Sequence, residues 1–147
     1  MKKKILITGG AGFIGSNLAN YLSLKKNIKV DVCDNLLTGN INNINRSIKF
    51  FKVDVNSFKH LEPIFKKNRY DYVFHYAAVV GVQRTLKNPI QVLDDIKGLE
   101  NIFKLCVKYK IKRIFFSSSS EVYGEPVHIP QNEEITPLNS KLPYAVV

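Results

Sequence analysis

Four glycines near the start of the chain have the spacing of a phosphate-binding loop. The segment TGGAGFIG, residues 8–15, fits the pattern G-x-G-x-x-G from Gly10 onward and the pattern G-x-x-G-x-x-G from Gly9 onward. In such loops one glycine permits a tight turn, one lets the backbone approach a pyrophosphate, and one lets the next helix pack against the strand. The N–H groups that open this helix attract the phosphates. The residues predicted to contact the diphosphate are Gly9, Gly12, Phe13, Ile14 and Gly15.

A carboxylate follows this loop at the distance expected for a residue that binds ribose. Asp34 comes 19 residues after Gly15, close to the spacing of about 20 residues that is typical of dinucleotide-binding folds. A carboxylate at this position accepts hydrogen bonds from a ribose 2′-hydroxyl, whereas it repels a 2′-phosphate. Since residues 35–38 contain no arginine, we predict NAD rather than NADP. Asp31 is a rival acid in mid-strand, and Asp54 either meets the adenine amine or caps the end of a strand.

Hydroxyl groups cluster after the last apolar run of the chain. The run SSSSEVYG, residues 117–124, directly follows this apolar run. Because functional groups gather at the carboxyl ends of parallel strands, where ligands bind, we assign the hydroxyl cluster a functional role rather than that of a plain loop. His75 ends an earlier apolar run, and we interpret it as packing beside a cofactor rather than as a catalytic group.

Short apolar runs alternate with helical patterns, and this alternation defines the scaffold that must position these residues. Strands are predicted over residues 4–8, 28–33, 48–53, 71–76 and 111–117, and helices over 12–25, 57–67 and 89–108. The first helix is expected to bury Ile14, Leu18 and Leu22. The apolar stripe predicted for the long helix consists of Leu93, Ile96, Leu99, Phe103 and Cys106. Such alternation forms βαβ units, and right-handed crossovers then give an α/β doubly wound parallel sheet, a Rossmann fold, with strand order 3-2-1-4-5 and truncated after the fifth strand.

Composition limits the kinds of partner that the protein can have. The 147 residues carry a formal charge of +10, and lysine supplies most of the positive charge. Because the lysines are scattered and arginine is scarce, we interpret them as a solvated face, partly attracting a diphosphate substrate, and expect no nucleic-acid partner. No apolar stretch approaches the roughly 20 residues of a membrane span, and the apolar run after residues 1–4 is too short for a signal peptide. We therefore expect a cytoplasmic protein without a membrane partner.

The cysteines and the C-terminal segment indicate no further chemistry. Cys33 and Cys106 each lie inside an apolar run, which predicts buried thiols. No spacing of cysteine and histidine fits zinc, so no metal is expected. Residues 125–142 are rich in proline and are predicted to form a loop.

Taken in order, these segments resemble the N-terminal half of the extended short-chain dehydrogenases/reductases, in the group of nucleotide-sugar epimerases and dehydratases. The matching segments are Thr8–Gly15, Asp34-Asn35, Asp54-Val55, His75–Ala78, Ser117–Gly124 and Tyr144. The resemblance implies an NAD-binding Rossmann domain over residues 1–147, with the substrate domain absent from this chain. It also implies a homodimer of the full-length protein, formed through the helix at 89–108 together with a helix that would begin at Tyr144. The further cofactor contacts that it implies are Asn35, Val55, Tyr76, Ala77, Ala78 and Ser117.

The resemblance also implies which residues carry out catalysis. Tyr144 matches the tyrosine of a Tyr-x-x-x-Lys motif, whose lysine would occupy position 148, one residue past the end. Tyr144 would act as general base on a sugar hydroxyl while the carbon gives hydride to the nicotinamide. Lowering a tyrosine pKa from about 10 to about 7 takes about 4 kcal/mol, and without the lysine ammonium we expect the isolated chain to be inactive. Ser119 would hydrogen-bond the reacting oxygen, while Ser120 and Glu121 would contact the substrate.

The reaction that the resemblance favours is that of a UDP-hexose 4-epimerase, which oxidises sugar C4 transiently. UDP-galactose 4-epimerases usually carry a small or hydroxyl residue at the position of Glu121 and often a lysine at that of Val80. The run Ser-Glu-Val-Tyr-Gly is common in UDP-glucuronate decarboxylases, and 4,6-dehydratases carry an aspartate at the position of Ser120. Residues 79–84 look more like the equivalent stretch of hexose or hexuronate epimerases. The decarboxylase and dehydratase activities stay open as alternatives, and an NAD-binding sensor without turnover is disfavoured by Ser119 and Tyr144.

Overall fold

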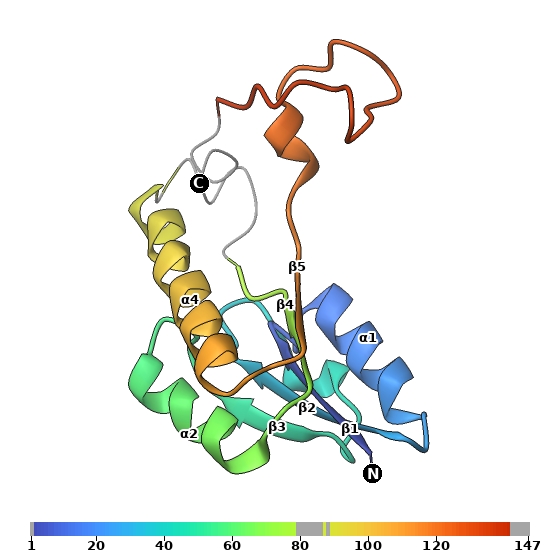
Figure 1. Cartoon of the computed structure of the whole chain (residues 1–147), viewed down its shortest axis with the longest axis vertical. Coiled ribbons are helices and arrows are strands. Elements are labelled where there is room, and N and C mark those ends of the chain that lie inside the picture. The colour runs from blue at the N-terminus through green and yellow to red at the C-terminus, as the bar shows by residue number, and fades with distance from the viewer. Residues whose placement is uncertain (1, 79–86, 88, 142–147) are drawn as a thin grey trace.

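The computed structural model describes residues 2–78, 87 and 89–141, and its centre is a parallel sheet of five strands (Figure 1). The sheet has the order β3-β2-β1-β4-β5, which confirms the predicted order. Every neighbouring pair of strands is parallel. The strands are β1 (Lys3–Thr8), β2 (Ile28–Asp34), β3 (Lys49–Lys52), β4 (Tyr72–His75) and β5 (Arg113–Phe116). All five carboxyl ends therefore lie at one edge, where a doubly wound sheet binds its ligands.

Helices cover both faces of the sheet. Helix α1 (Phe13–Ser23) lies on one side, whereas α2 (Phe58–Asn68) and α4 (Pro89–Lys108) lie on the other (Figure 1). Two short 3₁₀ helices that the sequence did not predict are η1 (Ile41–Asn43) and η2 (Ser120–Tyr123). The structure confirms a loop over the described part of the segment that follows Gly124.

Each face of the sheet has its own hydrophobic core, because successive side chains of a strand point to opposite faces. In β1, Ile5 and Ile7 pack with Ala19 of α1. Leu6 points the other way and packs with Phe65 of α2 and Ile102 of α4. Burial on both faces explains why β1 contains the unbroken apolar run Ile5-Leu6-Ile7.

The predicted apolar stripe of α1 is wrong at Ile14. This side chain is 64% exposed, whereas Leu18 and Leu22 pack partly against the core as expected. The buried side of the helix instead includes Gly15 and Ser16. Because Gly15 has no side chain, the start of α1 approaches the turn after β1 closely, and Ile14 faces away from it.

The predicted stripe of α4 is also partly wrong. Ile96 and Phe103 are 43% and 41% exposed, whereas Cys106 is buried as predicted. The side chain of Leu93 lies outside the described residues. The helix meets the core mainly through Ile102 and Leu105. The polar Asn101 belongs to the same buried face. Apolar spacing alone therefore does not predict which face of α4 is buried.

Strand β5 forms an edge of the sheet, and its side chains are largely uncovered. Phe115 and Phe116 are 39% and 53% exposed. Both cysteines are buried free thiols, as predicted, and burial raises the pKa of Cys33 to about 12. Within the described part of the chain, no helix combines the length and apolar character needed to span a membrane.

Candidate functional site

The first turn of the predicted phosphate loop packs closely against Tyr76 and Ala77, which follow β4. Gly9 has a φ of +65°, a left-handed conformation that glycine adopts without strain. A Cβ on Gly9 would lie 2.6 Å from the backbone N of Ala77 and from the carbonyl of Tyr76. Only glycine fits at this position. The turn and the segment after β4, both predicted cofactor contacts, are therefore neighbours.

The start of α1 has the features of an anion-binding helix terminus. A Cβ on Gly15 would lie 2.5 Å from the carbonyl oxygen of Gly9, so the helix begins directly on the turn. Gly12, the residue that precedes the helix, has no side chain to cap it, and the first turn of this fully described helix contains no acidic residue. Phe13 and Ile14 are 85% and 64% exposed. The opening N–H groups have no acceptors within the helix, and an anion would satisfy them.

Asp34 fixes the glycine loop from the neighbouring strand end. Its side chain is 7% exposed. One carboxylate oxygen accepts a hydrogen bond from the backbone N–H of Ala11 at 2.9 Å, and the other accepts one from Leu36 at 2.7 Å. A carboxylate accepts about four hydrogen bonds, so Asp34 retains acceptor capacity for a ribose hydroxyl. The rival Asp31 lies inside the core, where the hydroxyl of Tyr70 donates to it at 2.7 Å.

A group of asparagines that the sequence analysis overlooked holds the other side of the loop. The carbonyl of Ala11 accepts hydrogen bonds from the backbone N–H of Asn40 at 3.0 Å and from Nδ2 of Asn43 at 3.1 Å. Asn20 of α1 donates to the carbonyl of Asn43 at 2.8 Å and accepts from the N–H of Asn45 at 2.9 Å. The clustering of asparagine between residues 40 and 45 was the available signal, because asparagine side chains readily bond to backbone groups.

Asn35 and Asp54 lie together beyond the ends of β2 and β3. Nδ2 of Asn35 donates to one Asp54 oxygen at 3.1 Å. The other Asp54 oxygen accepts from the N–H of Asn56 at 2.8 Å, so this carboxylate caps the chain beyond the end of β3, which is one of the two roles left open by the sequence. Val55 is buried, and its carbonyl accepts from Nδ2 of Asn101 at 2.9 Å. Asn101, also missed from the sequence, thus ties this predicted adenine-side loop to α4.

His75 is a buried packing group beneath the loop. Its Nδ1 lies 2.6 Å from the hydroxyl oxygen of Thr8, which also accepts a hydrogen bond from the N–H of Ala77 at 3.4 Å. Burial lowers the pKa of His75 to about 4, so the ring is neutral at physiological pH. A neutral ring at this depth supports the ends of β1 and β4 and offers no charge for catalysis. Ala78, the next predicted contact, is exposed.

The serine segment stands apart from the glycine loop at the end of β5 (Figure 1). Ser119 is half-buried, and its hydroxyl oxygen accepts a hydrogen bond from the N–H of Glu121 at 3.2 Å. Ser117, Ser120 and Glu121 are exposed. Among the described residues, no hydrogen bond joins Ser119 to the glycine loop. Tyr144 lies outside the described residues.

A family comparison identifies this arrangement. Residues 5–147 match the model of the NAD dependent epimerase/dehydratase family. The chain belongs to this family. The match includes every predicted site residue, from Gly9 to Tyr144.

Individual members of the epimerase/dehydratase family show which activities accompany similar sequences. A Methanocaldococcus jannaschii protein, provisionally assigned as a UDP-glucose 4-epimerase, is 40% identical over 97% of this chain and 46% of its own length. The dTDP-D-glucose 4,6-dehydratase of Dictyostelium discoideum is 42% identical over 83% of this chain and 30% of its own length. The crystal structure of Thermus thermophilus UDP-glucose 4-epimerase with NAD superposes on 97% of this chain and 46% of that chain, with a TM-score of 0.89 and 33% identity. The present chain thus spans less than half the length of these relatives.

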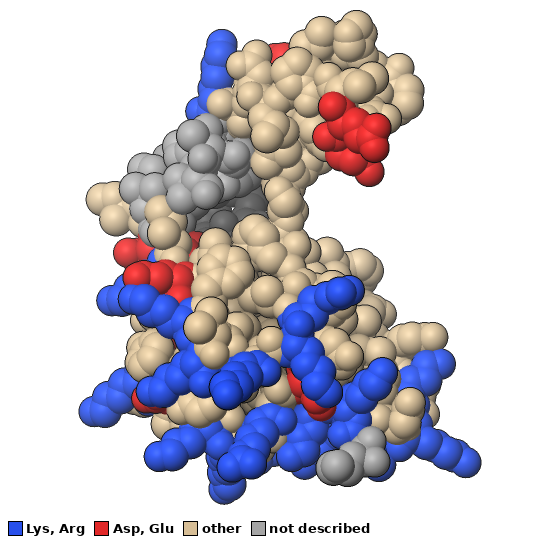
Figure 2. Space-filling view, in the orientation of Figure 1, with Lys and Arg blue, Asp and Glu red and all other residues tan. Residues whose placement is uncertain are grey.

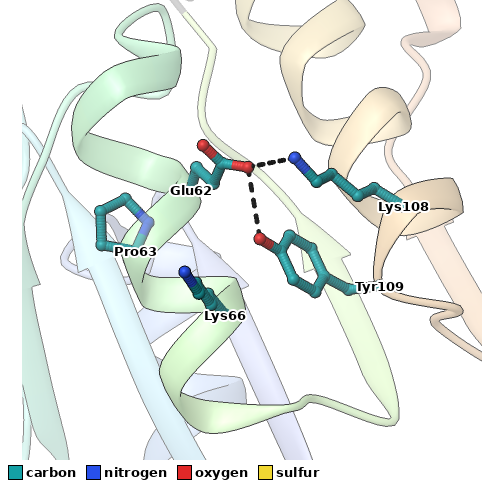
Figure 3. Close-up of a pocket in the computed structure, with 5 residues that line it drawn as sticks. All are labelled: Glu62, Pro63, Lys66, Lys108 and Tyr109. Carbon is teal, nitrogen blue, oxygen red and sulfur yellow. Dashed lines mark hydrogen bonds and ion pairs between the residues drawn. The ribbon is translucent and has the colours of Figure 1, made fainter.

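A groove between α2 and α4 is separate from the predicted nucleotide site (Figure 3). It is lined by Glu62, Pro63, Lys66, Lys108 and Tyr109. Lys108 donates to a Glu62 oxygen at 2.6 Å, and the Tyr109 hydroxyl donates to the same oxygen at 3.3 Å. The hydrogen bond from Lys108 lowers the pKa of Glu62. The groove holds none of the predicted site residues, and its one carboxylate, Glu62, is already paired with Lys108.

Proposed function

We propose that this chain supplies the NAD-binding half of a nucleotide-sugar epimerase, specifically a UDP-hexose 4-epimerase. The observation that carries the proposal is the uncapped start of α1, which begins directly on the Gly9 turn beside the Asp34 carboxylate. A diphosphate and the adjoining ribose match these two features. The similarity to the Thermus thermophilus epimerase, whose structure contains NAD, supports this assignment.

The residues at the carboxyl edge fit NAD in kind and order. The opening of α1, from Gly12 to Gly15, would bind the pyrophosphate, and Asp34 with Asn35 would bind the adenosine ribose. Asp54 and Val55 would border the adenine. The remaining contacts that we propose are Tyr76, Ala77, Ala78 and Ser117. When bound, NAD would supply the chemistry that accepts a hydride from the sugar and returns it.

Ser119 and Tyr144 are the residues to which we assign the proton chemistry. The hydroxyl oxygen of Ser119 accepts from the Glu121 N–H, so its own proton remains available to a sugar oxygen. A hydrogen bond donated by Ser119 to the sugar oxygen would stabilise the carbonyl group that develops there. Tyr144 would remove the proton from the sugar hydroxyl that Ser119 contacts, provided that a nearby cation lowers the pKa of Tyr144. Ser120 and Glu121, exposed beside Ser119, would contact the sugar.

A homodimer through α4 forms part of this proposal. Ile96 and Phe103 are 43% and 41% exposed on this helix, more than a core-facing stripe requires. A second copy of the protein would cover them. Phe103→Glu should therefore lower the molar mass measured by light scattering to that of a monomer, whereas an unchanged mass would remove α4 from the interface.

Product analysis tests the reaction directly. The protein that carries this sequence, extended through its C-terminal half, should interconvert UDP-glucose and UDP-galactose without net formation of NADH. A decarboxylase would instead release CO₂ from UDP-glucuronate, and a dehydratase would give a 4-keto-6-deoxy sugar, as the similarity to the Dictyostelium discoideum enzyme makes worth testing. NAD binding without any product from a panel of UDP- and dTDP-sugars would favour the sensor alternative and refute the enzyme.

A further inference from the structure

The lysines that are scattered in the sequence gather at one end of the folded molecule. In a doubly wound sheet, the amino ends of the strands and the carboxyl ends of the helices share an edge. Exposed lysines here include Lys25 and Lys26 after α1, Lys66 and Lys67 in the last turn of α2, and Lys110 and Lys112 after α4. Basic side chains also occupy the first or second position of β1, β2, β3 and β5. We call this edge the basic pole, and Figure 2 shows lysine and arginine crowded there.

Acidic side chains do little to neutralise the basic pole. Glu62 and Asp71 are each engaged in an ion pair, with Lys108 at 2.6 Å and with Lys112 at 2.7 Å. Most of the other carboxylates belong to the carboxyl edge, to α4 or to the segment after β5, and red side chains appear mainly in those parts of Figure 2. The formal charge of +10 is therefore distributed unevenly, with a strongly positive end.

The basic pole does not face the nucleotide site. The glycine loop and Asp34 lie at the carboxyl edge of the sheet, whereas the basic pole is formed by the amino ends of the same strands. The expectation that part of the lysine charge attracts a diphosphate substrate is therefore not supported by its location. A separate anionic partner fits this surface better.

The chemistry of the basic pole favours lipid headgroups over nucleic acid. Leu24 and Val107, next to the lysines at the ends of α1 and α4, are 76% and 80% exposed, and aliphatic side chains among lysines suit the boundary of a bilayer. Nucleic-acid surfaces favour arginine and aromatic rings that are free to stack on bases. Here Tyr21 lies under the ammonium of Lys25, at 4.3 Å from the ring centre.

We propose that the basic pole docks the protein peripherally on an anionic lipid surface, in place of the expectation from the sequence that the protein has no membrane partner. Lysines near such a surface each strengthen binding by about fivefold, and the exposed aliphatic side chains add an apolar contribution. In this orientation the carboxyl edge faces away from the bilayer, so the nucleotide site stays open. The proposal concerns a surface and is independent of which sugar the enzyme acts on.

Vesicle sedimentation with charge-reversed variants tests this surface. The wild-type protein should bind vesicles of phosphatidylcholine containing about one-third phosphatidylglycerol, but not pure phosphatidylcholine, and raising the salt from about 0.1 M to about 0.5 M should weaken binding. The variant Lys26→Glu/Lys67→Glu/Lys110→Glu should bind on the order of 100-fold more weakly. The matched control, Lys59→Glu/Lys97→Glu/Lys141→Glu, makes the same change in net charge away from the basic pole and should retain most of the binding.

Two further measurements separate this proposal from its rivals. NAD affinity of Lys26→Glu/Lys67→Glu/Lys110→Glu should equal that of the wild-type protein, because these three lysines lie at the opposite edge of the sheet from the glycine loop. Leu24→Ser/Val107→Ser should reduce the binding that survives at high salt. Equal losses in the two triple variants would overturn the basic pole as the docking surface. Absence of binding to anionic vesicles, or a mixed-sequence DNA duplex binding where vesicles do not, would overturn the lipid partner.

Discussion

Mild acid should destabilise the protein through the buried His75. Burial lowers the pKa of this residue to about 4, whereas histidine in an unfolded chain titrates near 6.5. Between these values the unfolded chain binds a proton that the folded chain excludes, so the free energy of unfolding falls as the pH falls. The stabilising contribution is fully present above about pH 6.5 and is lost as the pH decreases towards 4.

The size of the effect follows from the two pKa values of His75. Each unit of difference between the two pKa values corresponds to about 1.36 kcal/mol, so proton uptake by the unfolded chain lowers the free energy of unfolding by about 3 kcal/mol in total. About 2 kcal/mol of this loss occurs between pH 7.5 and pH 5. A native state with a stability of about 5–15 kcal/mol would lose a substantial fraction. Urea unfolding followed by circular dichroism at the two pH values measures this loss.

A pair of histidine variants isolates the contribution of His75. In His75→Asn, the amide can still bond to the Thr8 hydroxyl, which lies 2.6 Å from Nδ1 in the native protein, but it cannot take up a proton. The difference in unfolding free energy between pH 7.5 and pH 5 should shrink by about 2 kcal/mol in this variant. His60→Asn removes an exposed histidine and should leave the difference unchanged. An equal pH dependence in wild type and His75→Asn would refute the reasoning.

The other predictions concern the glycine loop and the buried carboxylate. Gly15→Ala should weaken NAD binding by more than about tenfold, measured by calorimetry, because its Cβ would lie 2.5 Å from the Gly9 carbonyl oxygen; affinity like that of wild type would contradict the assignment. Gly10→Ala would instead meet a side chain, Val32, at 2.4 Å, so the added change Val32→Ala should restore much of the lost binding, and no restoration would show a backbone cause. Tyr70→Phe should destabilise the fold by about 3 kcal/mol in urea unfolding, because it removes the Tyr70 hydrogen bond from the buried Asp31, whose Oδ1 has no partner among the described residues; a change below about 1 kcal/mol would contradict this account.

The glycine loop and the sheet could be predicted from the sequence because their signals are local. The spacing of Gly12 and Gly15 reflects contacts with Gly9 and Gly10 in the same strand–turn–helix unit, whereas Gly9 itself meets the distant segment after β4. The alternation of apolar runs and helical patterns likewise fixes βαβ units, and the handedness of crossovers then leaves few sheet orders. Asp34 could be predicted for the same reason, since its position follows from the length of one βαβ unit.

The asparagine contacts and the faces of two helices could not be predicted from the same patterns. Asn43 and Asn101 act through backbone carbonyls that are distant in sequence, those of Ala11 and Val55. Such bonds leave no apolar periodicity. Phe103, by contrast, fits the periodicity but remains 41% exposed. A hydrophobic pattern shows that a helix face is apolar, but it does not show what covers that face.

The fold topology brings lysines that are scattered in the sequence together on one surface. No two of Lys26, Lys67 and Lys110 are close in sequence, yet each follows or ends a helix on the same return path toward the amino edge of the sheet. A doubly wound fold repeats this path in every βαβ unit, so lysines at the ends of its helices accumulate at one edge. Cations at helix carboxyl ends also interact favourably with the helix dipole. This interaction accounts for single lysines at the ends of helices. It does not account for the basic residues at the starts of four of the five strands, which a docking surface explains.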